Sequence, residues 1–561
     1  MPQWLLKQLE DNPAVSLLDK NLSDLPLTST IQEALVIATS YKHRPRSILV
    51  VKKNLYQAQR LYERISSFLE DDECALFASD ESLRVEAIAS SPEMSAIKVE
   101  TMSSLLENPH QVVVTCPSAL LRFLPSSENF NDCIINIKVG EEMDMDQLKM
   151  KLIHGGYSQT SHVDQPLSFA ARGGIVDVYS INYDHPIRIE FFDTEIDSIR
   201  FFDEGSQKTI KQVKEVKIVP ASDVLFTDAE IEEIKTKAAA LLENNANAEI
   251  EADLDALENH IFEKRMYPYT ALLDHASGIW EYMDTPVIIL SDPSEVTASI
   301  KHFLEDSIQY VQEMVQEGKM LPKYSLFHEY SRIALDCKRI KEDPFIDNIS
   351  NVHEVNIPNE TLDVRLKMIN TPEKNVLALN AKEIERVIHT CMEEHIPYQM
   401  IDAESEIKDG INIYLADYIQ GFQIGDHFHV YTASEIFEIH HHRGRYENKF
   451  RNAEVLHHYE DLSPGDYIVH ATYGVGQYVG IETREFQGVK RDFIKVVYRG
   501  NAELLVPLEQ FKLVRKFVSR EGVVPRLNKL GSGDWEKTKK RLQENVAHIA
   551  DRLISLYANR E

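Results

Sequence analysis

Cysteine and long apolar runs are both scarce in this sequence, and each absence excludes a class of protein. The five cysteines include no CxxC pair, so neither a disulfide framework nor a zinc ribbon is indicated. No apolar run approaches the roughly 20 residues of a membrane-spanning helix. Residues 1–20 carry Lys7, Glu10, Asp11 and Asp19 where a signal peptide would be apolar. The sequence therefore predicts a cytoplasmic protein that does not contact a membrane.

Glycine is absent from the first 139 residues, which weighs against a nucleotide site there. A phosphate-binding loop needs glycines, because backbone amides must point at the phosphate without interference from Cβ atoms. It also needs a lysine that holds the β and γ phosphates. The single Gly-Lys pair, Gly318-Lys319, lacks both the upstream glycine and the following Ser or Thr. ATP binding by this chain is therefore disfavoured.

Signatures of catalysis and of metal binding are missing as well. The sequence contains no GxSxG, HExxH or paired-carboxylate pattern. Three adjacent histidines, His440, His441 and His442, do not converge on one ion, so this segment is interpreted as a linker. We therefore expect the chain not to be an enzyme, and we expect it to hold no cofactor and no metal.

Positive charge is in short supply over most of the chain. Sixty Lys and Arg face 90 Asp and Glu, which gives a formal net charge of −30. Such a surface repels DNA phosphates and anionic lipid, so any nucleic-acid contact has to be local. Residues 511–561 are the exception, with 12 basic and 6 acidic residues. Their cluster Lys537, Lys539, Lys540 and Arg541 could touch phosphates, but a solvated helix face is the favoured interpretation.

What the sequence does contain is the alternation of strands and helices typical of α/β domains. Its 561 residues are enough for roughly three to five domains. Apolar runs at 47–51 and 286–290 predict buried strands. Ser291-Asp292-Pro293 predicts the capped start of a long helix that ends near Gly318. Between these runs, residues 142–220 alternate as strands do, so a mostly β insertion is expected to interrupt one α/β domain.

The sequence patterns change towards the C-terminus. Residues 342–431 have the pattern of a second, small α/β unit, and the last hundred residues contain short strands separated by glycine-containing turns, as in a small β-barrel. After Gly533-Asp534, apolar residues recur at intervals of four and three, which predicts a helix with one apolar stripe. That stripe consists of Leu542, Val546, Ile549, Leu553 and Leu556.

Two groups of segments resemble modules of a known bacterial family. Residues 171–178 (ARGGIVDV), 186–193 (PIRIEFFD) and 195–200 (EIDSIR) resemble the UvrB-homology module, which the excision-repair protein UvrB shares with the transcription-repair coupling factors. Residues 464–480 (PGDYIVHATYGVGQYVG) and 505–507 (LVP) resemble the CarD-like module that interacts with RNA polymerase.

The two modules in this order are specific to the transcription-repair coupling factors (Mfd). Residues 77–81 and 91–93 resemble stretches of that family's first domain, and residues 528–535 resemble the start of its relay helix, so the resemblance spans nearly the whole chain.

The resemblance implies a multidomain α/β architecture. It comprises a degenerate UvrB-like α/β domain with an inserted α+β domain, a small α/β domain, a small Tudor-like β-barrel and a long C-terminal helix. We expect the UvrB-like domain at 1–138 and 220–340, the inserted UvrA-binding-like domain at 139–219, the small α/β domain at 341–435, a linker at 436–457, the CarD-like barrel at 458–520 and the relay helix at 521–561.

The sequence departs from the family pattern in two ways. In the family a RecG-like, ATP-driven DNA translocase follows the relay helix, whereas this sequence stops at Glu561. We therefore expect an N-terminal half, with ATP and magnesium required by the missing motor alone. The stretch Leu27-Thr28-Ser29-Thr30 stands where UvrB has its phosphate loop, and no tyrosine occurs between Glu63 and Gly156, where UvrB has a tyrosine-rich hairpin for damaged DNA.

Candidate contact residues for UvrA lie on one predicted strand and beside it. In the strand 187–192 side chains alternate, so Arg188 and Phe192 share the face opposite the apolar one. By resemblance this surface contacts UvrA, with Arg172, Arg188 and Phe192 at the family's contact positions and Arg200 in the same patch. The alternative is a surface salt bridge beside a second core aromatic.

Leu504 is the candidate contact for RNA polymerase. It lies in a predicted strand of the barrel, where a strand at the edge could pair with a strand of a partner. By resemblance its position lies at the contact with the polymerase β subunit. The alternative, that Leu504 belongs to the barrel core, is nearly as well supported by the residues alone.

Together these features predict an adaptor that binds stalled RNA polymerase and recruits UvrA for transcription-coupled nucleotide excision repair. We expect a monomer that contacts DNA mainly through the missing motor. One alternative is a stand-alone CarD-like transcription regulator, which would not need the module at 172–200. The other is an ATP-dependent damage-binding enzyme like UvrB, against which the missing glycines speak.

Overall fold

A computed structural model of the chain falls into two compact units, Met1–Arg443 and Gly444–Glu561. Within the residues it describes, every helix is too short or too polar to traverse a bilayer. The described residues are 1–19, 24–27, 29–80, 83, 92–163, 166–203, 205–242, 247–323, 325–333, 338–342, 350–437, 467–470, 474–486, 489–500, 502–507, 514–516 and 527.

A six-stranded parallel sheet forms the first domain of the larger unit. Its order is β1-β14-β13-β2-β4-β3, so strands from both sides of the insertion meet in one sheet. The apolar strands β2 and β4 are buried along their whole length, as is usual for a parallel sheet covered on both faces. The strands are β1 (Asp24–Leu27), β2 (Ile48–Val51), β3 (Cys74–Phe77), β4 (Val112–Thr115), β13 (Val287–Ser291) and β14 (Lys338–Glu342).

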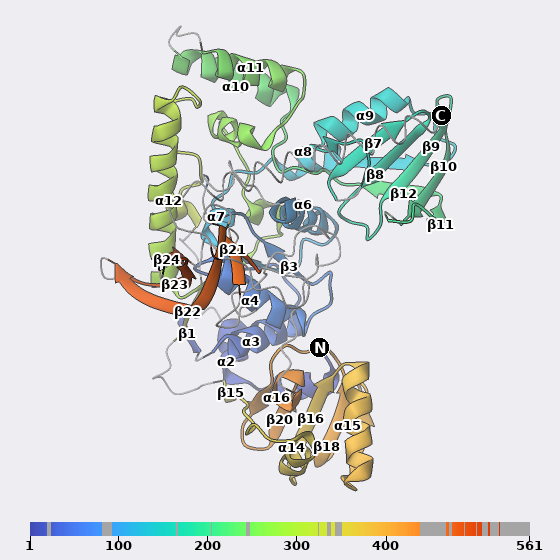
Figure 1. Cartoon of the computed structure of the whole chain (residues 1–561), viewed down its shortest axis with the longest axis vertical. Helices are drawn as coiled ribbons and strands as arrows, with labels where there is room; N and C mark the ends of the chain where they lie inside the picture. Colours follow the sequence, from blue (N-terminus) through green and yellow to red (C-terminus); the bar gives the residue numbers. More distant parts are fainter. Residues whose placement is uncertain are drawn as a thin grey trace. The chain divides into compact units, whose positions relative to one another are not determined.

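Helices flank this sheet on both sides. Figure 1 shows α3 (Thr30–His43) and α4 (Leu55–Ser66) side by side, and α6 (Pro92–Glu107), α7 (Pro117–Leu120) and α12 (Pro293–Gln316) away from them. Right-handed crossovers require this division, because the chain moves in opposite directions along the sheet in the two sets. The predicted long helix after Pro293 is confirmed.

The start of α12 differs from the prediction in its capping. Asp292 precedes the helix in the left-handed conformation, at φ 56°, and its side chain makes no capping hydrogen bond. The hydroxyl of the neighbouring Ser291 accepts a 2.7 Å hydrogen bond from the Lys52 ammonium instead.

The insertion forms its own mixed sheet, in the order β11-β10-β9-β8-β7-β6. Figure 1 shows α9 (Met145–His154) lying across this sheet. A separate antiparallel pair, β5 (Ile135–Lys138) with β12 (Glu215–Ile218), joins the two ends of the insertion. The six strands are β6 (Ser158–Gln159), β7 (Ser168–Arg172), β8 (Ile175–Tyr179), β9 (Ile187–Phe192), β10 (Glu195–Phe202) and β11 (Thr209–Val213).

A buried ion cluster fastens the end of the insertion to the first domain. The Asp223 carboxylate, just after β12, accepts hydrogen bonds from Lys98 Nζ of α6 at 2.9 Å and from Arg122 Nε at 2.5 Å. All three side chains are at most 4% exposed. The two cations hold the pKa of Asp223 well below its ordinary value even though burial alone would raise it.

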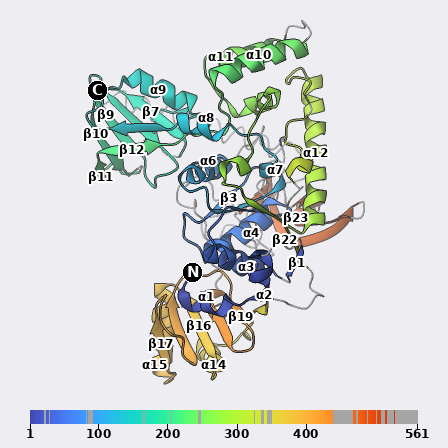
Figure 2. The ribbon, with the colours of Figure 1, turned by 180° about the vertical axis from the view of Figure 1, so that it is seen from behind.

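The small α/β domain includes a helix from the N-terminal end of the chain. Its sheet has the order β15-β19-β20-β16-β18-β17, and α14, α15 and α16 pack on one face. The other face holds α1 (Gln3–Leu9), whose Trp4 ring lies 5.3 Å from Tyr414 and 6.1 Å from Phe428; Figure 2 shows α1 against this sheet. The elements are β15 (Val352–Glu354), α14 (Leu362–Ile369), β16 (Lys374–Leu379), α15 (Ala381–Glu393), β17 (Tyr398–Ile401), β18 (Gly410–Leu415), β19 (Phe422–Ile424), β20 (Phe428–Tyr431) and α16 (Ala433–Phe437).

Shorter helices complete the larger unit. The pair α10 and α11 precedes two 3-10 helices that lead back to β13. These elements are α2 (Pro13–Asp19), α8 (Ser127–Asp132), α10 (Asp228–Leu242), α11 (Ala248–Glu258), η1 (Lys264–Leu272), η2 (Ile279–Tyr282) and α13 (Tyr330–Ile333).

The smaller unit contains an antiparallel sheet of order β24-β23-β22-β21-β25. Its closure into a Tudor-like barrel stays a prediction. The predicted linker histidines 440–442 and the residues of the predicted relay helix other than 527 lie outside the described residues. The strands are β21 (Tyr467–His470), β22 (Gly474–Phe486), β23 (Val489–Tyr498), β24 (Ala502–Pro507) and β25 (Val514–Lys516).

Asp223→Asn should destabilise the larger unit by about 3 to 5 kcal/mol, because it removes the buried negative charge that Lys98 and Arg122 share. Since the folded pKa of Asp223 is depressed, its contribution is present above the unfolded pKa of roughly 4 and is lost as the pH falls further. Urea unfolding at pH 7 and at pH 3 measures both effects.

The matched control is Asp274→Asn, which removes an exposed carboxylate paired with Lys237. Its urea midpoint should stay close to that of the parent. Equal midpoints for Asp223→Asn and the parent at pH 7 would contradict the importance of the buried cluster.

Candidate partner-binding surfaces

One face of the inserted sheet collects the arginines that the sequence singled out. Arg188 of β9 is paired in register with Arg200 of β10 and with Asp177 of β8. Residues opposite each other on neighbouring strands point to the same face, and so do residues two apart along one strand. Arg172, Glu190 and Phe192 therefore join this face, which we call the arginine face.

Asp177 organises the arginines at the centre of this face. Its carboxylate is buried, with 2% of the side chain exposed, and accepts hydrogen bonds from Arg188 Nε at 2.7 Å and Nη2 at 2.8 Å. Arg172 Nη2 approaches the same carboxylate at 3.4 Å. Arg188 also donates to Gln207 and lies 4.3 Å from the centre of the Phe202 ring. The hydrogen bonds to Asp177 hold the pKa of Arg188 above its usual value.

Glu190 orients Arg200 in the same way that Asp177 orients Arg188. It accepts hydrogen bonds from both terminal nitrogens of Arg200, at 2.8 and 2.5 Å, and from the Ser198 hydroxyl at 2.7 Å. These donors, Arg200 first, lower the pKa of Glu190. Two arginines of the face are thus held in fixed orientations by carboxylates of neighbouring strands.

Phe192 and Arg172 are the exposed members of the face. The Phe192 side chain is 78% exposed, so it is not a second core aromatic. The alternative interpretation from the sequence also included a salt bridge at these arginines. That part does occur, because Arg172 and Arg188 both pair with Asp177. The arrangement offers a partner one large apolar side chain beside oriented cations, a combination common at interfaces.

Sequence reasoning missed the residues that hold the arginines. Asp177 and Gln207 were not singled out, although Asp177 stands between Val176 and Val178 in a strand. A lone carboxylate among apolar neighbours is a signal for a buried ion pair, because a carboxylate is rarely buried without a partner.

Leu504 lies on β24, which ends the five-stranded sheet of the smaller unit in the described residues. It is half-buried and packs against the core cluster that includes Ile494, Val496 and Tyr498. The residue opposite it on β23 is Val496, and the neighbouring Lys495 binds Glu503 at 2.9 Å. Leu504 therefore combines both interpretations, since it contacts the core and belongs to an edge strand.

A buried ion pair lies near the turn that corresponds to the phosphate loop of UvrB. The turn from β1 to α3 contains Ser29, and Glu33 lies in the first turns of α3. Glu33 accepts a 2.8 Å hydrogen bond from Lys52, which follows β2, and both side chains are at most 4% exposed. The Lys52 ammonium is thus engaged by a carboxylate from the helix that follows this turn.

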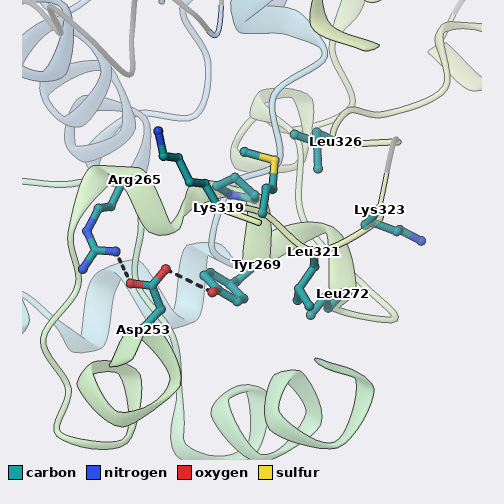
Figure 3. Close-up of a pocket in the computed structure, with 10 residues that line it drawn as sticks. Asp253, Arg265, Tyr269, Leu272, Lys319, Leu321, Lys323 and Leu326 are labelled. Carbon is teal, nitrogen blue, oxygen red and sulfur yellow. Dashed lines mark hydrogen bonds and ion pairs between the residues drawn. The ribbon is translucent and has the colours of Figure 1, made fainter. Parts of the chain in front are cut away.

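A second polar group lies at a small cavity next to α11. Figure 3 shows Asp253 between Arg265, with which it forms an ion pair, and the Tyr269 hydroxyl, which donates to it at 3.0 Å. Burial raises the pKa of Tyr269. With a volume of about 20 Å³ the cavity has room for roughly one water molecule. Asp253, Arg265 and Tyr269 are engaged with each other, so we regard this group as a structural connection between α11 and η1.

Asp177→Asn should loosen the arginine face, because it removes the counter-charge of the half-buried Arg188. A loss of about 3 kcal/mol corresponds to roughly 100-fold faster opening of β8 and β9. Amide hydrogen exchange of the full chain, followed on peptides from residues 168–202, measures this rate.

The control for this variant is Arg172→Gln. Its side chain is 57% exposed, and an ion pair at such a site contributes about 1 kcal/mol or less. Exchange in β8 that responds equally to both substitutions would refute a central role for Asp177.

Comparison with known proteins identifies two domains. The family model described as the UvrB interaction domain matches residues 135–224, which include the arginine face. The family model described as the CarD-like/TRCF RID domain matches residues 462–518, which include Leu504.

Curated relatives align with nearly the whole chain. A transcription-repair-coupling factor from Bacillus subtilis is 29% identical over 551 residues, covering 92% of this chain and 47% of the relative. Those of Staphylococcus haemolyticus and Staphylococcus aureus are 29% and 30% identical and cover 94% of this chain and 48% of each relative. The chain thus spans about half the length of the curated relatives it matches. The resemblance predicted from the sequence is therefore confirmed, and the chain is a homologue of the transcription-repair coupling factors.

Proposed function

We propose that this chain is an adaptor that binds RNA polymerase and UvrA at the same time. The observation that carries the proposal is the presence of a UvrB interaction domain and a CarD-like domain in one chain, at residues 135–224 and 462–518. In this role it recruits UvrA to stalled polymerase for transcription-coupled nucleotide excision repair, as a cytoplasmic monomer.

The arginine face is the proposed site for UvrA. Its support is the combination of the exposed Phe192 with arginines whose orientation is fixed by Asp177 and Glu190. Side chains that are already ordered lose less conformational entropy when a partner binds. A partner surface with an apolar pocket and acidic groups fits this face.

The edge strand β24 is the proposed site for the polymerase β subunit. A strand at the edge of a sheet offers backbone groups for pairing with a partner strand. Leu504 supports this assignment as a half-buried apolar residue on that strand.

The proposal gives this chain no nucleotide chemistry. Lys52 is engaged by Glu33 and Ser291, and the segment between β1 and α3 contains no glycine. A phosphate that bound beside Lys52 would have to displace a buried ion pair. Translocation on DNA, with its ATP and magnesium, is not part of the role proposed for these residues. A stand-alone CarD-like regulator is not favoured, because it has no use for a UvrB interaction domain.

Phe192→Ala should weaken binding of purified UvrA at least tenfold, because the side chain is 78% exposed in the free chain and would be buried in the complex. The affinity is measured by biolayer interferometry with the full chain immobilised, at near-physiological salt. Arg188→Ala should weaken it as well, but that change also removes two of the hydrogen bonds that the buried Asp177 accepts.

Met150→Ala is the matched control for Phe192→Ala. Met150 is 46% exposed on α9 of the same domain, away from the strands that carry the arginine face. UvrA affinity that is unchanged in Phe192→Ala, or lowered equally in Met150→Ala, would count against the arginine face.

Leu504→Arg should abolish retention of RNA polymerase core by the immobilised chain, because it places a charge in the proposed apolar contact. Val479→Arg makes the same chemical change at a residue of β22 that is 46% exposed, and should leave retention unchanged. Far-UV circular dichroism checks that both variants fold. Retention by a folded Leu504→Arg variant would exclude this strand as the polymerase contact.

A further inference from the structure

A large cleft in the larger unit is not used by the proposed function. It has a volume of about 540 Å³, within the range of roughly 300–1,000 Å³ typical of binding pockets. Its walls include Phe123, residues 273–276, Trp280 and residues 327–329, and Ile288 of the central strand β13 reaches it. Neither the arginine face nor Leu504 lies in its lining.

Three rings form an aromatic wall in this cleft. The His328 imidazole lies 4.5 Å from the Phe123 ring at 75° and 4.9 Å from the Trp280 ring at 67°, both edge-to-face arrangements. His328 Nε2 is 3.1 Å from the carbonyl oxygen of Ser277, which fixes the plane of the imidazole. Phe327 packs behind the wall against Phe303.

Backbone hydrogen bonds hold the segments that carry these rings. Leu124 and Ser277 exchange two hydrogen bonds, with the Leu124 amide donating at 2.7 Å and the Ser277 amide at 3.0 Å. The His328 amide donates to the carbonyl of Leu121 at 2.8 Å. The segment 121–124 is thus bound on one side by residue 277 and on the other by residues 327–328, so the rings sit on a fixed frame.

The Trp280 ring depends on a glycine beside it. A Cβ atom at Gly278 would lie 2.2 Å from Cη2 of Trp280, far inside van der Waals contact. Gly278 has φ −111°, a conformation open to any residue, so it is the position of the indole that requires glycine. Substitution of this glycine would displace the ring without straining the backbone.

The rim of the cleft is acidic. Asp274, Glu281 and Glu329 line it together with one lysine, Lys323. Lys237 pairs with Asp274 from outside the cleft, and His275 lies 3.5 Å from Glu281. Aromatic faces and carboxylates both attract cations, whereas phosphates would be repelled. Charge and shape thus favour a basic side chain over a nucleotide.

We propose that this cleft is a docking site for a short basic segment of a partner protein, with an arginine or lysine inserted against the aromatic wall. The volume exceeds that of one side chain, so an apolar residue next to the basic one would occupy the remainder. This site is separate from the proposed UvrA and polymerase contacts, and it would give the adaptor a third point of attachment.

The test is fluorescence anisotropy of a labelled peptide, Gly-Arg-Leu-Arg-Gly-amide, titrated with the full chain at near-physiological salt. The neutral analogue Gly-Gln-Leu-Gln-Gly-amide should bind at least tenfold more weakly. Gly278→Ala should weaken binding of the basic peptide at least tenfold, and Trp280→Leu should do the same without a steric clash.

Matched variants separate the cleft from general attraction to an acidic protein. Gly278→Ala keeps the net charge, and Ile308→Ala, at a 41% exposed position of α12 outside the cleft lining, should leave the affinity unchanged. The proposal is overturned if Gly278→Ala and Trp280→Leu both bind like the parent, if the neutral peptide binds equally well, or if no saturable binding occurs. Displacement by equimolar spermidine would assign the cleft to a free amine and overturn it too.

Discussion

The buried cluster of Asp223, Lys98 and Arg122 is the interaction on which the geometry of the larger unit depends. It joins a residue after the insertion to two residues before it, at distances of 2.9 and 2.5 Å. Burial of three charges is costly unless each is paired, and here one carboxylate serves two cations. A shift of the end of the insertion would therefore separate the buried Asp223 from both cations.

The same cluster connects the insertion to the aromatic cleft. The Arg122 guanidinium lies 3.9 Å from the centre of the Tyr267 ring, and the Tyr267 hydroxyl donates to the carbonyl of Leu326 at 2.8 Å. Leu326 is followed by Phe327 and His328, which belong to the cleft. A short chain of contacts thus runs from Asp223 to the aromatic wall, so the proposed docking site and the base of the inserted domain share one support.

Local patterns in the sequence predicted individual strands and helices. They did not predict which residues far apart in the sequence contact each other. Alternation placed Arg188 and Phe192 on one face of a strand, and Pro293 marked the start of α12, because both features depend on neighbours within a few residues. The Lys98–Asp223 pair spans 125 residues, and no periodicity points to it. The packing of Trp4 on Tyr414 joins the two ends of the larger unit, and no local pattern points to it for the same reason. Leu504 illustrates a further limit, since a half-buried residue on an edge strand fits a core and a contact pattern equally well.

The engaged Lys52 bears on how an adaptor of this kind could work. In a nucleotide-dependent α/β domain, ligand binding supplies the counter-charges at the carboxyl ends of the strands, and the domain changes when the ligand leaves. Here Glu33 and Ser291 supply the partners of Lys52 from within the chain. The charge of the buried Lys52 is thus balanced within the chain. In the proposed adaptor role this domain serves as the platform on which two partners are held, and a change of state can be left to the partners themselves.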